Sequence, residues 1–524
     1  MIGDILRDQA DHVGDDVFLR FDDRCLSYGE INSRANAIGA GLKQLGVEIG
    51  DTVAILMENS LELAQTTFGV NKAGAIWSPT NTAYKGQWLA DTFADGRARV
   101  LVVDAAYLPR VLDLNDVPFD YIVVNGPCPD DVPVPAGVLS WEELAAGQGI
   151  PELPSTANCF STSAVMWTSG TTGRSKGVCQ SHSAWLAGAL TMARGYDTAE
   201  GDVFYCCVPM YNSGAWVTSL YASLVSGTQC AIDPRFSVSD FWNRCRKYEA
   251  TQIFTLGAMH MHLLQQKPSE SDLNNNVRVA GLIPIPPDAA AEFRRRFGVD
   301  YVWQGFGQSE VMPWSITHRG RLYKPGSCGT PRDDLDVRAL DDNDEEVPVG
   351  QVGEICIRPK RPGVIFSGYF GQPEATLKAF RNLWYHSGDL GRFDEDGELF
   401  FVDRKHDFMR YKGRNISSFE IECLVSRHPA VAEAVVYGVK SQELEFEDEP
   451  KLCVLLREGE IATAEDIALF IAHNAPYYLV PRYIEFVEGF PRTPTGKVQK
   501  FKLKEHGVTD RDWDRDAAGF VVAR

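Results

Sequence analysis

The stretch TSGTTGRSKGV at residues 168–178 is the strongest signal in the sequence. It follows the apolar run 164–167, which is typical of a buried strand, and it is rich in glycine and hydroxyl residues. The backbone N–H groups and hydroxyls of such a loop can wrap a polyphosphate. It is not a Walker loop, because Gly173 and Lys176 are separated where that motif requires Gly-Lys. Taken alone, the loop is equally consistent with a solvated polar turn.

The sequence around this loop alternates between strand-like and helix-like segments. Apolar runs at 52–57, 73–79, 99–104 and 121–124 are typical of buried strands, and 60–72 is typical of a helix. Alternation of this kind favours parallel sheets covered by helices. Phosphate sites in such folds lie at the carboxyl ends of strands. We therefore expect an α/β fold with a large N-terminal domain of helix-covered sheets.

The pattern changes near residue 390. Two strand-like runs flank an Asp-Gly turn within RFDEDGELFFV at 392–402, which predicts a hairpin. Asp394 and Asp396 superficially resemble a calcium loop, but the other ligands of that pattern are missing. About 120 residues remain, enough for a small, mobile α+β domain. Since 524 residues exceed one ordinary core, we expect domains at 1–403 and 404–524.

Composition narrows the function classes. The formal charge is −20, from 71 acidic and 51 basic residues, which argues against binding to nucleic acid or to an anionic membrane. The twelve cysteines include no CxxC pair, as expected for reduced thiols in a cytoplasmic protein. The N-terminus lacks the apolar core of a signal peptide. No apolar run approaches the roughly 20 residues of a membrane-spanning helix.

The glycine-rich loop belongs to an ordered series of motifs. The others are NKAGAIWSPTN at 71–81, FGQSE at 306–310, the Gly-Glu-Ile strand from 353, WYHSGDLG at 384–391, the segment 403–422 and PRTPTGKVQK at 491–500. In this order, the series resembles the adenylate-forming superfamily of acyl-CoA synthetases, luciferases and peptide-synthetase adenylation domains. Within the acyl-CoA ligase branch, it is most similar to crotonobetaine/carnitine-CoA ligase-like members.

The resemblance implies a two-step reaction. ATP and a small-molecule carboxylic acid give an acyl-adenylate and pyrophosphate, and coenzyme A then takes the acyl group as a thioester. The implied cofactors and cosubstrates are ATP, Mg²⁺ and coenzyme A. Because a carboxylate must approach a polyanion, catalysis depends mainly on positioning and charge neutralisation. A homodimer is left open.

The resemblance also assigns the nucleotide site. The loop implied to hold the β- and γ-phosphates comprises Thr168, Ser169, Gly170, Thr171, Thr172, Gly173 and Lys176. Glu310 is the implied ligand of Mg²⁺, a hard cation suited to carboxylate and phosphate oxygens. Phe306 is expected against the adenine face, and Ser309 keeps the hydroxyl of the usual Thr. Asp389 and Arg404 are the implied ribose contacts.

The implied catalytic lysine is Lys497, whose compact ammonium would act between the substrate carboxylate and the α-phosphate. In the superfamily the C-terminal domain then rotates about a hinge, and the hinge position here is His406, where Lys or Asp is usual. Gly413 is expected on the thiol channel, where a side chain would obstruct. Arg410 and Asn415 match polar positions near the α-phosphate and the adenylate.

The acyl pocket is expected from segments 211–219, 281–284 and 303–314. Its implied residues are Asn212, Trp216, Gly281, Trp303, Gly305 and Met312. Asn212 stands where related ligases have His, and it cannot become cationic. Ser175 replaces a customary Pro of the phosphate loop and is expected to loosen it.

The tryptophans allow two interpretations. They could form a cation–π site for a betaine-like acid, or they could pack the pocket of an aliphatic, aryl or steroid-side-chain acid. The second interpretation is favoured, because aromatic residues line most small-molecule sites.

Two alternative functions also remain. One is a stand-alone adenylation enzyme that loads a carrier protein. The other is a non-catalytic nucleotide-binding relative, although Lys497, Glu310 and Asp389 are all present.

Overall fold

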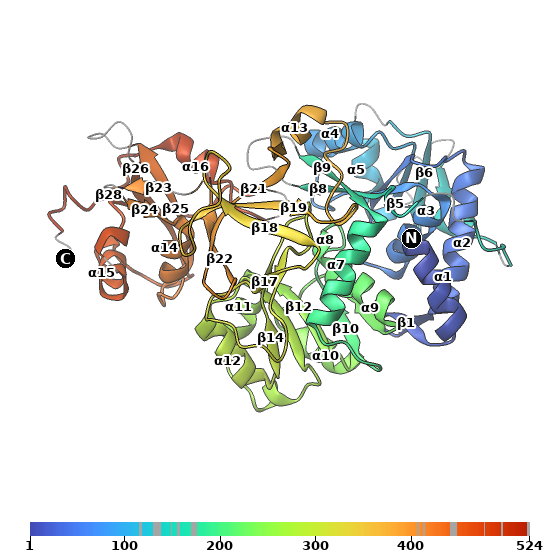
Figure 1. Ribbon diagram of the computed structural model, residues 1–524, viewed down its shortest axis with the longest axis horizontal. Helices are drawn as coiled ribbons and strands as arrows, with labels where there is room; N and C mark the ends of the chain where they lie inside the picture. The colour runs from blue at the N-terminus through green and yellow to red at the C-terminus, as the bar shows by residue number, and fades with distance from the viewer. Residues whose placement is uncertain are drawn as a thin grey trace. The chain divides into compact units, whose positions relative to one another are not determined.

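The computed structural model describes residues 1–114, 118–128, 138–147, 149–154, 158–168, 175–405, 407, 409–411, 414–440, 448–475, 477–493 and 496–520 (Figure 1). The chain forms two compact units. The first contains Met1–Thr168, Arg174–Val337 and Ile357–Leu383. The second contains Arg338–Cys356 and the chain from Trp384 onward. The predicted boundary at 403/404 stays a prediction.

The first unit contains two seven-stranded sheets. One has the strand order β7-β6-β5-β3-β4-β8-β9, with bounds Val138–Ser140, Tyr121–Asn125, Val100–Asp104, Thr52–Leu56, Ile76–Pro79, Thr162–Thr168 and Lys176–Ser181. The other has the order β14-β13-β12-β10-β11-β1-β2, with bounds Tyr301–Trp303, Val279–Ile283, Gln252–Leu256, Val203–Cys206, Gln229–Ile232, Val17–Phe21 and Arg24–Ser27. Both sheets are parallel except at β8–β9 and β1–β2. The expected α/β fold is therefore confirmed.

The apolar runs of the sequence form the buried strands of the first sheet. β3 is buried along its whole length and pairs in parallel with both β4 and β5. The predicted helix between β3 and β4 is α3 (Leu61–Ala73). It begins where Ser60 accepts a hydrogen bond from the backbone N–H of Leu63, and it ends at Gly74 with φ of 82°. Sequence therefore fixes this βαβ unit locally.

A chain of aromatic side chains joins the two sheets of the first unit. Phe18 of β1 contacts Phe68 of α3 at 6.0 Å between ring centroids, and Phe68 contacts Tyr221 of α9 (Tyr221–Ser226) at 6.3 Å. Trp216 continues the chain, 5.3 Å from Tyr221 and 4.6 Å from Trp77 of β4. These rings are fully buried. Large aromatic surfaces thus hold the helices between the sheets.

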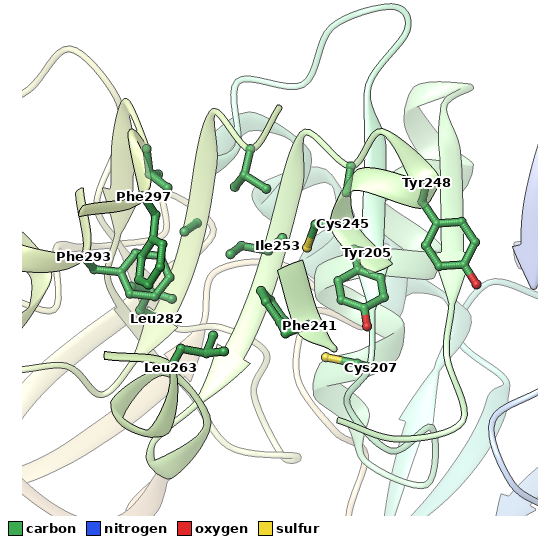
Figure 2. Close-up of a cluster of buried hydrophobic side chains, with 14 of the residues drawn as sticks. Tyr205, Cys207, Phe241, Cys245, Tyr248, Ile253, Leu263, Leu282, Phe293 and Phe297 are labelled. Carbon is green, nitrogen blue, oxygen red and sulfur yellow. The ribbon is translucent and has the colours of Figure 1, made fainter. Parts of the chain in front are cut away.

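The outer face of the second sheet carries its own core (Figure 2). Ile253 of β12 and Leu282 of β13 pack with side chains from α10 (Phe241–Tyr248), α11 (Ala258–Gln265) and α12 (Pro287–Phe297). The labelled residues Phe241, Phe293 and Leu263 come from these three helices. This packing fixes the carboxyl ends of β12 and β13, where a segment of the predicted acyl pocket begins.

Short strands complete the first unit. β15 (Gly305–Phe306), β16 (Ser315–Ile316) and β17 (Thr330–Pro331) form an antiparallel sheet. Helix α7 (His182–Gly195) follows β9, and α8 (Ser213–Ala215) precedes a π-helical turn at Trp216–Leu220. The remaining helices of eight residues or more are α1 (Ile2–Val13), α2 (Tyr28–Gln44) and α4 (Gly86–Gly96).

The second unit begins its long C-terminal part with a hairpin. β21 (Trp384–Phe393) and β22 (Leu399–Arg404) pair antiparallel, so the predicted hairpin at 392–402 is confirmed. A further sheet has the order β25-β26-β27-β28, with bounds Val431–Lys440, Asp448–Leu456, Tyr483–Phe486 and Trp513–Asp514. Helices α14 (Ser418–Val425) and α15 (Ala464–Asn474) bury apolar residues against it, among them Ile421 and Ile467. This is an α+β arrangement, as expected.

None of the described helices is long and apolar enough to cross a membrane. All twelve cysteines lie within the described ranges, and none of them is in a disulfide.

Candidate functional site

The glycine-rich loop connects two antiparallel strands of the first unit. Thr168 at the end of β8 pairs with Lys176 at the start of β9, and the Thr168 hydroxyl donates to the Lys176 carbonyl over 3.3 Å. Residues 169–174 of the loop lie outside the described residues. Ser175 is buried, with its hydroxyl 3.4 Å from that of Tyr84. The two ends of the predicted phosphate loop are therefore held together by the sheet.

Glu310, the predicted metal ligand, is buried in the first unit. Its side-chain Oε1 accepts a hydrogen bond from the Tyr369 hydroxyl over 3.0 Å. The Lys176 ammonium lies over the ring of the same tyrosine, 4.8 Å from its centroid. A carboxylate oxygen is the donor that Mg²⁺ prefers, so Glu310 fits the predicted ion by its chemistry. The structure thus brings together two of the residues that the sequence singles out.

The backbone at Glu310 is held on two sides. The Gln180 amide of β9 donates to the carbonyls of Ser309 and Glu310, and the latter bond is 3.2 Å long. The Phe366 N–H also donates to the Glu310 carbonyl over 2.8 Å. Ser309 contacts the next segment through its hydroxyl, 3.2 Å from that of Ser213. The segment FGQSE is thereby fixed against the strand that follows the loop.

Asn59 holds the segment that contains Asn212. Its amide donates to the carbonyls of Val208 and Asp233 over 3.0 and 2.9 Å, and its Oδ1 accepts from the Met210 N–H over 2.7 Å. Asn212 itself is half-buried and precedes α8, where its N–H donates to the Pro209 carbonyl. Asn59 is therefore a positioning group that the sequence reasoning missed.

The predicted pocket tryptophans are buried in the core. Trp216 and Trp314 are 0% exposed and Trp303 is 1% exposed. Trp303 stacks on Phe254 and covers Gly281, where a Cβ atom would lie 2.2 Å from the indole. Trp216 donates its N–H to the Met210 carbonyl over 2.6 Å. These placements favour packing over an open cation–π face.

The other predicted residues of this segment lie close to these rings. Phe306 is half-buried, and its ring lies 5.0 Å from that of Trp314. Met312 is buried, and its carbonyl accepts from the Arg332 guanidinium over 3.2 Å. At Gly305 a Cβ atom would come within 2.8 Å of the Ser315 carbonyl, so the tight β15–β16 pair requires glycine there.

Asp389 and Arg404 lie opposite each other in the second unit. They pair across β21 and β22, and the Arg404 Nε is 2.8 Å from the Asp389 Oδ1. Asp389 is fully buried, whereas the Arg404 side chain is about half exposed (48%). The two predicted ribose contacts are thus brought together by strand register.

Glu354 forms hydrogen bonds to residues of this hairpin and of the segment that follows it. It accepts hydrogen bonds from the Gly388 N–H over 3.1 Å and from the Lys405 ammonium over 3.0 Å, and it lies 3.2 Å from the His386 ring. Burial alone would raise the pKa of Glu354, but His386 and Lys405 hold it at about 2. Cys356 lies 3.3 Å from the same imidazole nitrogen. Glu354, His386, Lys405 and Cys356 therefore form one polar network, which is bonded to the backbone of Gly388.

The predicted hinge lies only partly within the described residues. His406 and Gly413 lie outside them. Arg410 of β23 (Met409–Tyr411) and Asn415 of β24 (Arg414–Ile416) are paired in register. Asp403, one residue before the predicted boundary, accepts from the N–H and the hydroxyl of Ser418 at the start of α14 over 2.5 and 3.3 Å.

Lys497 lies in a tight turn of the second unit. Its N–H donates to the Thr493 hydroxyl over 3.1 Å, and its carbonyl accepts from the Thr493 N–H over 2.7 Å. Gly496 has φ of 82°, a conformation that favours glycine. The Lys497 residue is exposed. The turn therefore presents the predicted catalytic lysine at the surface of its own unit.

Lys500 anchors the base of this turn, a role that the sequence reasoning missed. Its ammonium lies 2.8 Å from the Glu422 carboxylate and donates to the Ser418 hydroxyl over 2.8 Å. Burial raises the pKa of Glu422, although Lys500 acts against it. Its place in the sequence could have pointed to this residue, because Lys500 is the final residue of the motif that contains Lys497.

Asp394 completes the turn of the hairpin. Its Oδ1 accepts from the N–H groups of Asp396 and Glu398 over 3.0 and 2.9 Å. This is ordinary Asp-turn chemistry, in agreement with the hairpin interpretation.

Two segments of the chain match models of known protein families. Residues 6–370 match the model of the AMP-binding enzyme family, and residues 420–497 match the AMP-binding enzyme C-terminal domain. Among curated proteins, a crotonobetaine/carnitine–CoA ligase of Salmonella heidelberg (strain SL476) is 29% identical over 516 residues, or 95% of this chain and 97% of that protein. The Salmonella arizonae protein of the same name is 30% identical over 91% of this chain and 93% of that protein.

Solved structures have the same fold. An anthranilate CoA ligase in complex with anthranoyl-AMP superposes with a TM-score of 0.86 and 26% identity, covering 96% of each chain. An O-succinylbenzoate coenzyme A synthetase from Bacillus subtilis, in complex with AMP, has a TM-score of 0.82 and 23% identity, covering 95% of this chain and 98% of that chain.

Proposed function

Because the chain belongs to the AMP-binding enzyme family, in its acyl-CoA ligase branch, we propose that it converts a carboxylic acid, ATP and coenzyme A into an acyl-CoA thioester. In the first step a carboxylate oxygen attacks the α-phosphorus of ATP and pyrophosphate leaves. In the second step the thiol sulfur of coenzyme A attacks the acyl carbon, the thiol proton is lost and AMP leaves.

One observation carries the proposal most directly. Glu310 and Lys176 both contact Tyr369, beside the strand end from which the glycine-rich loop departs. A carboxylate for a hard cation and an ammonium for phosphate oxygens are the charges that a metal-bound triphosphate requires. Their convergence supports binding of Mg²⁺ and ATP in the first unit.

The residues have separate roles in the first step. Lys176 and the loop hydroxyls would hold the terminal phosphates, and Glu310 would hold Mg²⁺. The ion, when bound, supplies positive charge to the phosphate oxygens. Lys497 would place its ammonium against the charge that develops at the α-phosphate and the carboxylate. The Asp389 carboxylate would accept hydrogen bonds from the ribose hydroxyls, and the Arg404 guanidinium would donate to their oxygens.

The second step would use a different position of the domain 404–524. In this proposal the segment around His406 acts as the hinge, and Arg410, Gly413 and Asn415 line the path of the adenylate and the thiol. Movement about a few residues at the ends of elements is the usual mechanism of such closure. The match of residues 420–497 to the C-terminal domain of the family supports a separate folding unit there.

We further propose that the acid is aliphatic, aryl or a steroid side chain, and not a betaine held by an indole cage. A cation–π site needs an open ring face. The three tryptophans of the predicted pocket segments are fully buried or nearly so, and Trp216 and Trp303 pack on other aromatic rings. Because the Salmonella relatives are named crotonobetaine/carnitine–CoA ligases, betaine-like acids are the alternative that has to be tested directly.

The test is pyrophosphate release from ATP with a panel of acids, with and without coenzyme A. The panel contains crotonobetaine, carnitine, anthranilate, benzoate, medium-chain fatty acids and a steroid-side-chain acid. Acid-dependent release, with thioester formed only when coenzyme A is present, is expected. Acid-dependent release without any thioester would favour transfer to a carrier protein. No release with any acid would favour a non-catalytic nucleotide-binding protein.

A further inference from the structure

Tyr369 connects the two charged residues of the predicted triphosphate site through different parts of one side chain. The hydroxyl donates to the Glu310 Oε1 over 3.0 Å, and the ring lies 4.8 Å from the Lys176 Nζ. The three residues are distant in sequence, and all lie in the first unit. The phenol can therefore serve an anion and a cation at once, because its O–H is a donor and its π-face is electron-rich.

The backbone around Tyr369 is firmly anchored. Its own N–H donates to the Thr376 hydroxyl over 2.9 Å, and it forms an antiparallel bridge with Val178 of β9. The neighbouring Gly368 carbonyl accepts from the Cys179 N–H over 3.0 Å, and the Phe370 N–H donates to the Gly177 carbonyl over 2.7 Å. Tyr369 thus lies beside the strand that begins with Lys176.

Glu310 is anchored to the same strand by other bonds. The Gln180 amide of β9 donates to the Glu310 carbonyl, and the Phe366 N–H does the same from the Tyr369 segment. With its backbone fixed, the remaining freedom of Glu310 is the orientation of its carboxylate. The Tyr369 hydroxyl restrains that orientation through its hydrogen bond to Oε1, and the tyrosine is itself only 8% exposed.

We propose that Tyr369 is a positioning residue that aims the Glu310 carboxylate at Mg²⁺ through its hydroxyl and holds the Lys176 ammonium ready for phosphate through its ring. This inference rests on the proposed function, since it assumes that the first unit binds metal and ATP. The two roles use different atoms of the phenol, and they can be separated by substitution.

Tyr369→Phe removes the hydroxyl and keeps the ring, whereas Tyr369→Leu removes both. Binding of ATP is measured by titration calorimetry, first without divalent ions and then over a series of Mg²⁺ concentrations. For Tyr369→Phe we expect the affinity for ATP without Mg²⁺ to be unchanged. The Mg²⁺ concentration that gives half of the Mg²⁺-dependent increase in ATP affinity should be about 3- to 10-fold higher than in the wild-type chain. For Tyr369→Leu we expect the same Mg²⁺ shift and a 2- to 5-fold weaker affinity without Mg²⁺.

Tyr221→Phe is the matched control. Tyr221 is also buried in the first unit, and its hydroxyl has no hydrogen-bond partner within the described part of the chain. Its replacement should change neither affinity. The melting temperature of each variant shows whether it folds. If Tyr369→Leu does not fold, Tyr369→Phe still tests the role of the hydroxyl, because it preserves the packing of the ring.

Three outcomes overturn the inference. One is an unchanged Mg²⁺ dependence in Tyr369→Phe, and another is an equal loss of Mg²⁺-free affinity in the Phe and Leu variants. If the wild-type chain shows no Mg²⁺-dependent ATP binding, the inference fails together with the proposed metal site. If it binds Mg²⁺ and ATP with the expected variant pattern but releases no pyrophosphate with any acid, the proposed reaction fails and the positioning role stands.

Discussion

The guanidinium of Arg404 covers the fully buried carboxylate of Asp389, with 2.8 Å between Nε and Oδ1. The pair is set by the register of β21 and β22. The last residue of a hairpin strand thus supplies the partner of a buried acid in the neighbouring strand. A buried carboxylate is costly without such a partner, and this relationship is the basis of the first prediction.

Arg404→Met should destabilise the second unit more than Asp389→Asn does. Arg404→Met removes a cation from beside a buried carboxylate, which we expect to cost about 1–3 kcal/mol after allowing for the half-exposed arginine. Asp389→Asn keeps the size of the side chain and removes the charge. Urea unfolding followed by fluorescence measures both, and equal losses would contradict the pairing argument. Both variants should also raise the KM for ATP about 10-fold if the pair binds ribose, because a hydrogen bond to a charged group is lost.

Lys497→Ala should reduce acid-dependent pyrophosphate release about 10²- to 10³-fold, because a preorganised charge at the α-phosphate is lost. Thioester formation from supplied acyl-adenylate should be largely retained. The control is Lys502→Ala, which removes an exposed lysine five residues away and should leave both steps intact. Equal losses in the two half-reactions would contradict separate conformations for the two steps.

Lys500→Met should destabilise the second unit by about 3 kcal/mol, because the mostly buried Glu422 would lose its partner. In the double variant with Glu422→Met, much of that loss should be recovered, since no charge is then left unpaired. Chemical unfolding of the two variants measures the difference. A double variant as unstable as the single one would show that the ion pair is not the cause.

Gly281→Ala should destabilise the first unit by about 2 kcal/mol or more, because a Cβ atom there would lie 2.2 Å from the Trp303 indole. Trp303→Phe in the same chain should recover part of the loss by making room. Thermal unfolding is the measurement. If Gly281 and Trp303 also shape the acyl pocket, the double variant should change the ranking of acids in the panel, whereas ATP binding should not change.

Low pH should destabilise the protein through His260. Its ring is bonded on both nitrogens, 3.0 Å from the Thr255 hydroxyl and 2.9 Å from the Pro284 carbonyl, and burial lowers its pKa to about 4. Between pH 6.5 and 4, His260 is therefore protonated in the unfolded chain but stays neutral in the folded chain. The free energy of unfolding consequently falls as the pH falls. The full effect is roughly 3 kcal/mol.

The matched variant for this prediction is His260→Gln, which cannot titrate in that range. Its free energy of unfolding should depend less on pH between 6.5 and 4 than that of the wild-type chain, although other groups still titrate. Parallel pH profiles for the two proteins would contradict the assignment to His260.

The parallel sheets, the hairpin at 392–402 and the family could be predicted from the sequence. These follow from local patterns, because buried strands read as apolar runs and an Asp-Gly turn fixes a two-stranded ribbon. Candidate site residues in the phosphate loop, FGQSE and the lysine motif could also be named from the sequence, since each lies in a contiguous motif, and their roles stay predictions.

The contacts between those motifs could not be predicted from the sequence and are seen in the folded chain. Tyr369 meets Glu310 and Lys176, Asn59 holds the Asn212 segment, and Lys500 pairs with Glu422, in every case across a long sequence separation. The tertiary structure also placed Trp216 in the aromatic core between the sheets. The physical reason is that hydrogen bonds and ring contacts depend on which elements pack together. The spacing of residues along the chain does not predict that packing.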